Sequence, residues 1–168
     1  MDKKKIWYLV ISILIPLFIG FLGSLLGGSM SLFDNIEKPW FAPPAILFPI
    51  AWGILYILMG VSSYLVYTSD SEYKKTGLIF YAIQLIVNAL WTMIFFRFEN
   101  FLFAFVWLLL LLLIVLAMMY YFYKSNKVAF YLQIPYVLWL IFASILNYSI
   151  YTSVSYTHLR AHETAANL

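Results

Sequence analysis

Five stretches of apolar residues constrain this chain more than any other feature of its sequence. They fall at residues 6–27, 44–67, 76–96, 101–123 and 128–151, and none of them contains Asp, Glu, Lys, Arg or His. A helix of about 20 apolar residues crosses the hydrocarbon layer of a bilayer. The runs are continuously apolar, without the alternation of a β-barrel strand. The chain is therefore predicted to be an all-α membrane protein, a five-transmembrane-helix bundle.

The overall composition supports a membrane protein and excludes several other classes. The chain is 65% hydrophobic and 10% charged, whereas soluble domains carry roughly 25% charged residues. It has no cysteine, which excludes a disulfide scaffold and a thiolate metal site or nucleophile. The net charge of +3 comes from basic residues between the apolar runs. It indicates membrane topology, and no nucleic-acid partner is expected.

The five helices are expected to form a single membrane domain over residues 1–152. The turns between the last four helices are short, so only the connection at 28–43 is long enough to have a structure of its own and to act as a lid. Residues 153–168 change abruptly to a polar composition. We expect this tail to be an appended segment that does not belong to the native fold.

Basic residues are distributed unequally between the two sides of the predicted bundle. The N-terminal segment and the loops at 68–75 and 124–127 hold seven of the ten Lys and Arg residues, while the other side holds Lys38, Arg97 and Arg160. Because basic loops stay in the cytoplasm, this asymmetry predicts a cytoplasmic N-terminus and an external C-terminus. The charge-poor loops favour a multi-pass protein of a bacterial plasma membrane.

The lack of titratable residues inside the spans bears on mechanism. Ion-coupled transporters keep a charged residue at membrane depth, and hydrolases need acids, bases or nucleophiles. The five apolar runs contain no Asp, Glu, Lys, Arg or His, and the chain has no Cys. The sequence therefore disfavours ion-driven transport and conventional hydrolysis, and no metal site or cofactor is expected.

Aromatic residues in the second span indicate a ligand pocket. A proline-rich loop at 38–44 leads into Phe48, Trp52 and Tyr56, which are four residues apart. Side chains with this spacing lie on one face of a helix, one turn apart. Since leucine and isoleucine would suffice for lipid contact, the rings are expected to line a cavity under the loop.

The third and fifth spans pair a tryptophan with an amide on one helix face. The two sets are Gln84, Asn88, Trp91 and Phe95, and Pro135, Trp139, Ala143 and Asn147. A buried amide in hydrocarbon needs a partner, so each asparagine either bonds a neighbouring helix or lines a cavity. Trp52 and Trp139 each carry an indole donor, and their rings are expected to sandwich a flat ligand.

A ridge of small residues follows one face of the first span. Gly20, Ser24 and Gly28 are four residues apart, and Gly23 and Gly27 add a GxxxG pattern. Such ridges allow helices to approach closely. The contact lies either inside one bundle or between two protomers, and the pattern alone does not distinguish these.

Three motifs together resemble a known family. The first is Lys-Pro-Trp-Phe-Ala-Pro-Pro at 38–44 with the aromatic residues that follow and Gly60. The second is Asn-Ala-Leu-Trp at 88–91 with Phe95 and Phe96. The third comprises Pro135, Tyr136, Trp139, Ala143, Leu146 and Asn147. In this order they cover nearly all of residues 6–152 and resemble the TspO/translocator protein family, the tryptophan-rich sensory proteins or peripheral-type benzodiazepine receptors.

The resemblance implies a membrane receptor or sensor, commonly a homodimer, that binds flat hydrophobic ligands. Porphyrins such as protoporphyrin IX and other haem precursors, and benzodiazepine-site compounds, are the implied ligands. The implied ligand-binding residues are Pro43, Pro44, Phe48, Trp52, Tyr56, Asn88, Trp91, Trp139, Ala143 and Asn147. Two alternatives stay open: a porphyrin or sterol transporter, and an enzyme that degrades protoporphyrin in light and oxygen. In the enzyme, Trp52 and Trp139 would be the catalytic residues, without acid–base groups.

Overall fold

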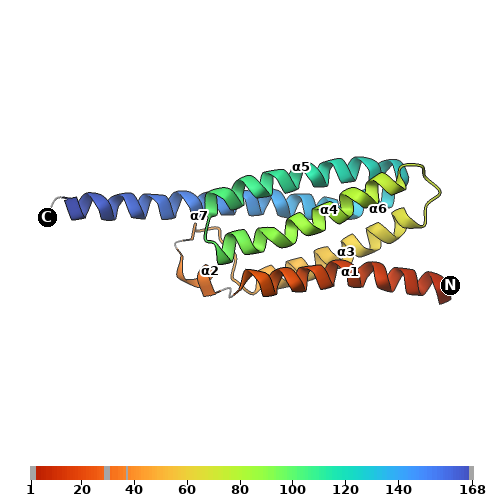
Figure 1. The fold of residues 1–168 in the computed structure, drawn as a ribbon, viewed down its shortest axis with the longest axis horizontal. Coiled ribbons are helices and arrows are strands. Elements are labelled where there is room, and N and C mark those ends of the chain that lie inside the picture. The colour runs from red at the N-terminus through yellow and green to blue at the C-terminus, as the bar shows by residue number, and fades with distance from the viewer. Residues whose placement is uncertain (1–2, 29–30, 37, 167–168) are drawn as a thin grey trace.

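The apolar runs form five long helices that lie side by side and run up and down (Figure 1). The computed structural model describes residues 3–28, 31–36 and 38–166. The long helices are α1 (Lys3–Gly27), α3 (Leu47–Tyr67), α4 (Lys74–Thr92), α5 (Phe101–Ser125) and α7 (Ile134–Ala166). Five helical segments of the described chain are long and apolar enough to cross a membrane. The predicted all-α membrane fold with five spans is therefore confirmed.

Three short elements complete the chain. They are α2 (Ser31–Asn35), the π-helix η1 (Met93–Arg97) and α6 (Lys127–Leu132). Helix α1 packs against α3 and α4, α4 against α5, α5 against α7, and α3 against α6. The helices thus close a ring in the order α1, α3, α6–α7, α5, α4.

The bundle has two ends of different character (Figure 1). We call one the lysine end, because the N-terminus and the α3–α4 and α5–α6 turns meet there with most of the lysines. We call the other the lid end, because α2 and the α4–α5 turn lie there. Helix α7 runs past the lid end and continues as one helix to Ala166. The predicted tail thus begins within this helix.

The second span starts later than predicted. The pattern placed its start at residue 44, but α3 begins at Leu47. Pro43 and Pro44 lack backbone donors, and a proline disfavours helical backbone at the residue before it. The chain first makes two tight turns, with the Leu47 amide donating to the Pro44 carbonyl (2.9 Å) and the Phe48 amide to the Ala45 carbonyl (3.2 Å).

The last span is not one helix. Residues 128–151 were predicted to be continuous, but α6 ends at Leu132 and α7 starts at Ile134. Pro135 has no N–H for an acceptor one turn earlier, so the helical ladder is interrupted there. The Gln133 amide instead donates to the Phe130 carbonyl at 3.0 Å, which tightens the last turn of α6.

The end of the third span is wound differently from an α-helix. In η1 the amide of Phe98 donates to the carbonyl of Met93, five residues earlier, at 3.1 Å. A π-turn accommodates one extra residue and rotates the side chains that follow it. The chain then turns at Glu99, which has a φ of 51°, and the Asn100 side chain accepts from the Phe103 amide and caps α5.

Two apolar clusters form the core. One is shared by α3, α4, α5 and α7 and includes the fully buried Met59, Leu111 and Met118. The second lies at the lid end, where Phe33 of α2 is 2% exposed and packs edge-to-face on Phe48 at 4.9 Å. The lid loop is therefore anchored to the bundle through its own short helix.

The small residues of α1 face the inside of the bundle. A Cβ added at Gly23 would lie 3.2 Å from the Ala89 backbone, and one at Gly27 would overlap Thr92. Gly60 of α3 faces α1 in the same way, because a Cβ added there would lie 2.5 Å from Cα of Ile13. These glycines let α1 approach α3 and α4 closely. For Gly23 and Gly27, the ridge therefore serves contacts within one bundle.

Candidate ligand-binding cavity

A partly open cavity of about 290 Å³ lies between α1, α3 and the end of α4. We call it the inner cavity. Its described lining contains no charged residue and is dominated by aromatic rings. The lining residues are Leu17, Gly20, Phe21, Ser24, Gly28, Phe48, Pro49, Trp52, Gly53, Tyr56, Asn88, Trp91, Thr92 and Phe96.

Helix α3 supplies an aromatic wall to this cavity. Phe48, Trp52 and Tyr56 all line it, as their fourfold spacing predicts. The rings of Trp52 and Tyr56 stack with centroids 5.4 Å apart and planes 29° apart. The ring of Tyr56 also lies directly against Gly20 of α1, where there is no room for a Cβ. This close approach holds the tyrosine ring in the wall.

Two polar side chains of α4 close the opposite wall. Asn88 is 3% exposed, and its amide donates to the Tyr56 hydroxyl at 3.2 Å. Trp91 donates its indole N–H to the side-chain oxygen of Asn147 at 3.4 Å. Asn88 therefore lines the cavity and also links α3 to α4, so both interpretations of its sequence pattern hold.

Asn147 has a different place from Asn88. It is 2% exposed, accepts from Trp91 and donates to the Phe101 carbonyl at 2.8 Å. These bonds tie α7 to α4 and α5, and the residue does not contact the inner cavity. Ala143, one turn earlier, is 9% exposed and belongs to the main core. Both residues stand behind the cavity wall.

A second hollow, more open than the inner cavity, runs between α3 and α7. We call it the outer groove; its volume is about 640 Å³, and Pro43, Leu138, Trp139 and Phe142 are among the apolar side chains that line it. Trp139 and Pro43 thus face this groove and not the inner cavity. Pro44 is exposed and lines neither.

The two tryptophans predicted to form a sandwich meet each other instead. The rings of Trp52 and Trp139 are 6.4 Å apart at 81°, an edge-to-face contact. Trp139 also meets Phe48 edge-to-face at 6.0 Å. Trp52 lines the inner cavity and Trp139 lines the outer groove, so the pair forms the partition between the two spaces.

The indole donors divide into two groups. Trp91 donates to Asn147, and Trp107 donates to the Val87 carbonyl at 2.8 Å. For Trp52 and Trp139, the described part of the chain contains no acceptor of the indole N–H. A buried or half-buried indole usually finds a partner. Trp52, a residue of the inner cavity's lining, therefore has an indole N–H that is unused within the described structure.

Several cavity residues are absent from the sequence prediction. Gly20 and Ser24 line it, although their spacing on the first span predicts only a close contact between helices. Gly53 also lines it, and a Cβ there would meet no atom within 4 Å. Phe96 takes the place expected for Phe95, because the π-turn rotates the end of α4. No sequence signal marks that turn.

The fold defines a multi-pass α-helical membrane protein, and its described residues form an aromatic cavity with an uncharged lining. The chain matches the model of the TspO/MBR family over residues 12–152. It is 38% identical over 149 residues to the tryptophan-rich protein TspO of Archaeoglobus fulgidus, which covers 85% of this chain and 94% of that protein.

Two further relatives have different names. Protein CrtK of Rhodobacter capsulatus is 38% identical over 121 residues, or 71% of this chain and 76% of that protein. The translocator protein of Homo sapiens is 33% identical over 129 residues, or 74% and 76%. The chain therefore belongs to the TspO/MBR family.

Proposed function

We propose that this protein is a membrane receptor or sensor that binds flat hydrophobic ligands in the inner cavity. Porphyrins such as protoporphyrin IX, and benzodiazepine-site compounds, are the proposed ligand classes. The observation that carries the proposal is an uncharged aromatic cavity whose wall holds an indole donor, that of Trp52, without an acceptor in the described structure. The sensory and translocator names of the relatives are in keeping with it.

The chemistry of the wall fits a flat aromatic ligand. The stacked rings of Trp52 and Tyr56 offer a broad apolar face, and offset stacking on such faces stabilises a bound ring. Ligand sites are typically apolar with a few placed polar groups, and here those groups are the Trp52 indole and the Asn88 amide. Trp139 and Pro43 pack on the side of the partition that faces the outer groove. Ala143 and Asn147 make contacts between the helices behind the cavity wall.

The proposed setting is a bacterial plasma membrane, with the N-terminus in the cytoplasm and the protein as a homodimer. The clustering of lysines at one end of the bundle supports this orientation. The homodimer follows the resemblance to the family. Large apolar side chains cover the outer faces of the helices, which suits both lipid and a second protomer.

Substitution of Trp52 tests the proposed donor. Titration of the purified protein with protoporphyrin IX, followed by tryptophan fluorescence, should show affinity about three- to tenfold weaker in Trp52→Phe, because one hydrogen bond is lost. Trp7→Phe is the matched control, since Trp7 is 66% exposed at the lysine end. Equal affinity in the Trp52 variant and the wild type would refute the role of this donor.

Substitution of Gly53 tests the cavity itself. Gly53→Leu places a side chain in open space that the ligand is proposed to occupy. We expect ligand binding to fall at least tenfold while thermal stability is kept or raised, because a glycine inside a helix is unfavourable. Unchanged binding in a folded Gly53→Leu protein would show that the ligand sits elsewhere.

A titration of the wild type under illumination separates simple binding from porphyrin degradation. Degradation by the protein would bleach the ligand faster than in a protein-free control.

A further inference from the structure

A second hollow lies next to the inner cavity at the lid end. We call it the mouth hollow; its volume is about 480 Å³, and it lies between the end of α1, α2 and the α4–α5 turn. Gly28 and Phe96 line both this hollow and the inner cavity. The two spaces therefore share a wall. Taken together they have the size of ordinary ligand pockets, about 300–1,000 Å³.

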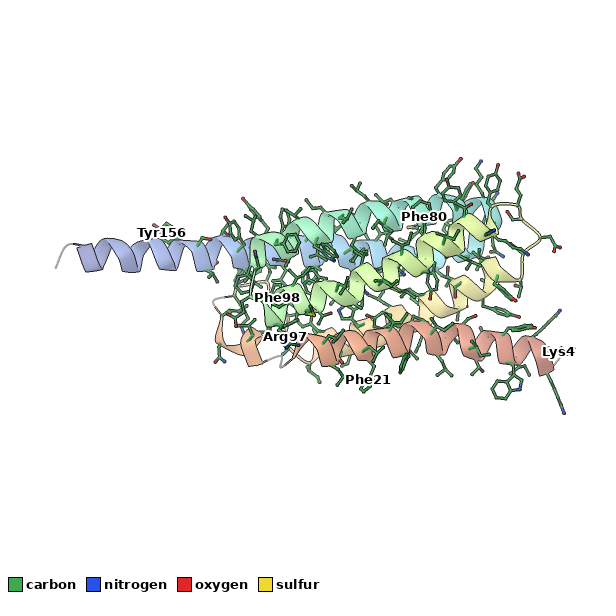
Figure 2. All side chains as sticks on the ribbon, in the orientation of Figure 1. Lys4, Phe21, Phe80, Arg97, Phe98 and Tyr156 are labelled. Carbon is green, nitrogen blue, oxygen red and sulfur yellow. The ribbon has the colours of Figure 1, made fainter. Side chains whose placement is uncertain are left out.

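The mouth hollow differs from the inner cavity in its charge. Arg97 and Glu99 both line it, whereas the inner cavity has no charged lining. Figure 2 shows Arg97 at the lid end of the bundle, beside the end of α1. A ligand that fills the inner cavity and reaches Gly28 and Phe96 would thus meet charged groups only at its outer edge.

The π-turn is what brings Arg97 to this position. Phe95 is 3% exposed and packs against Phe101 in the lid-end core, with ring centroids 5.1 Å apart. The extra residue of η1 turns Phe96 to the inner cavity and Arg97, the next residue, to the mouth hollow. π-turns are frequent at functional sites because they re-aim side chains.

Arg97 is also the cation best placed to act on a ligand. Within the described structure its guanidinium makes no ion pair or hydrogen bond, although Glu99 lines the same hollow. Lys38, the other described cation at this end, lies over the Phe33 ring at 4.9 Å and does not line the hollow. A guanidinium offers a planar fork of donors that matches a carboxylate.

We propose that Arg97 binds a carboxylate on the ligand and selects flat hydrophobic molecules that carry an acid group at one edge. The ring enters the inner cavity, and the carboxylate stays in the mouth hollow, at the level where water is available. Glu99 acts against this binding and limits it to ligands whose acid reaches the guanidinium. The inference rests on the proposed function, since it assumes that the ring occupies the inner cavity.

The test compares protoporphyrin IX, which has two carboxylates, with its dimethyl ester. Affinities for both are measured by tryptophan quenching in the wild type, Arg97→Gln, Glu99→Gln and the matched control Lys38→Gln. We expect Arg97→Gln to weaken binding of the acid about three- to tenfold and to leave the ester unchanged. Glu99→Gln should strengthen binding of the acid, and Lys38→Gln should change neither ligand. The preference for the acid should also decline with rising salt.

The possible failures are distinguishable. If the wild type binds acid and ester equally, or if Arg97→Gln shifts both by the same factor, the carboxylate site is refuted while the cavity stands. If the wild type binds neither ligand, the proposed function itself is refuted. A normal unfolding temperature of Arg97→Gln, whose side chain is exposed, shows that lost binding is not lost fold.

Discussion

At the scale of single residues, the tryptophans differ in what their indole groups do. The N–H of Trp107 reaches the Val87 carbonyl of the neighbouring helix, although a Leu-rich sequence around Trp107 predicts only lipid contact or packing. Where an acceptor lies nearby, the indole N–H forms a hydrogen bond that joins two helices. Where no acceptor lies nearby, the N–H is free to bind a ligand. The position of a carbonyl on another helix decides between these roles.

This difference leads to a prediction for Trp107. Trp107→Phe removes the bond to Val87, and hydrogen bonds between membrane helices contribute about 0.6–2 kcal/mol. We expect a lower unfolding temperature in detergent and unchanged affinity for protoporphyrin IX, because Trp107 lies outside the inner cavity. An unfolding temperature equal to that of the wild type would show that the bond contributes nothing to stability.

At the scale of elements, the break between α6 and α7 leaves a polar residue in an unusual position. Gln133 joins the two helices and is fully buried, yet neither its side-chain oxygen nor its nitrogen has a partner within the described structure. Gln84 of α4 is equally buried but accepts from the Tyr136 hydroxyl at 2.9 Å. The two glutamines therefore have opposite energetic roles.

The contrast is testable with one substitution at two sites. Gln133→Leu should raise stability by about 1–3 kcal/mol, because an unpartnered buried amide is replaced by an apolar group. Gln84→Leu should lower stability, since the Tyr136 hydroxyl loses its acceptor. Thermal unfolding of both variants in the same detergent measures this. Equal shifts of the two variants would contradict the assignment.

At the scale of the whole molecule, the unequal ends of the bundle predict its orientation. The chain has no cysteine, so a single introduced cysteine labels one site. Glu72 and Glu99 are exposed at the lysine end and the lid end. A membrane-impermeant thiol reagent should label Glu99→Cys in intact cells and Glu72→Cys only after permeabilisation. The reverse pattern would show that the bundle is inverted.

Much of the architecture is predictable from the sequence because a bilayer imposes it. Uninterrupted apolar runs require backbone bonds to close within each segment, which leaves helices. The interruptions of the helices are harder to predict from the sequence. The π-turn at 93–97 has no signature, and the late start of α3 and the break at Pro135 depend on local backbone bonds. That residues 153–168 stand outside the native fold stays a prediction; Val154 packs beside the lid-end core.

The candidate site, too, is predictable from the sequence only in part. Helical spacing alone places Phe48, Trp52 and Tyr56 on one wall, and the sequence by itself determined the five spans, the uncharged interior and this aromatic face. Only the tertiary structure decided that Trp139 lies behind Trp52, that Gly53 borders open space and that Arg97 reaches the mouth. Spacing specifies which side chains share a face of one helix. Which faces meet depends on how close neighbouring helices approach and how each is rotated, and these follow from packing across the whole bundle.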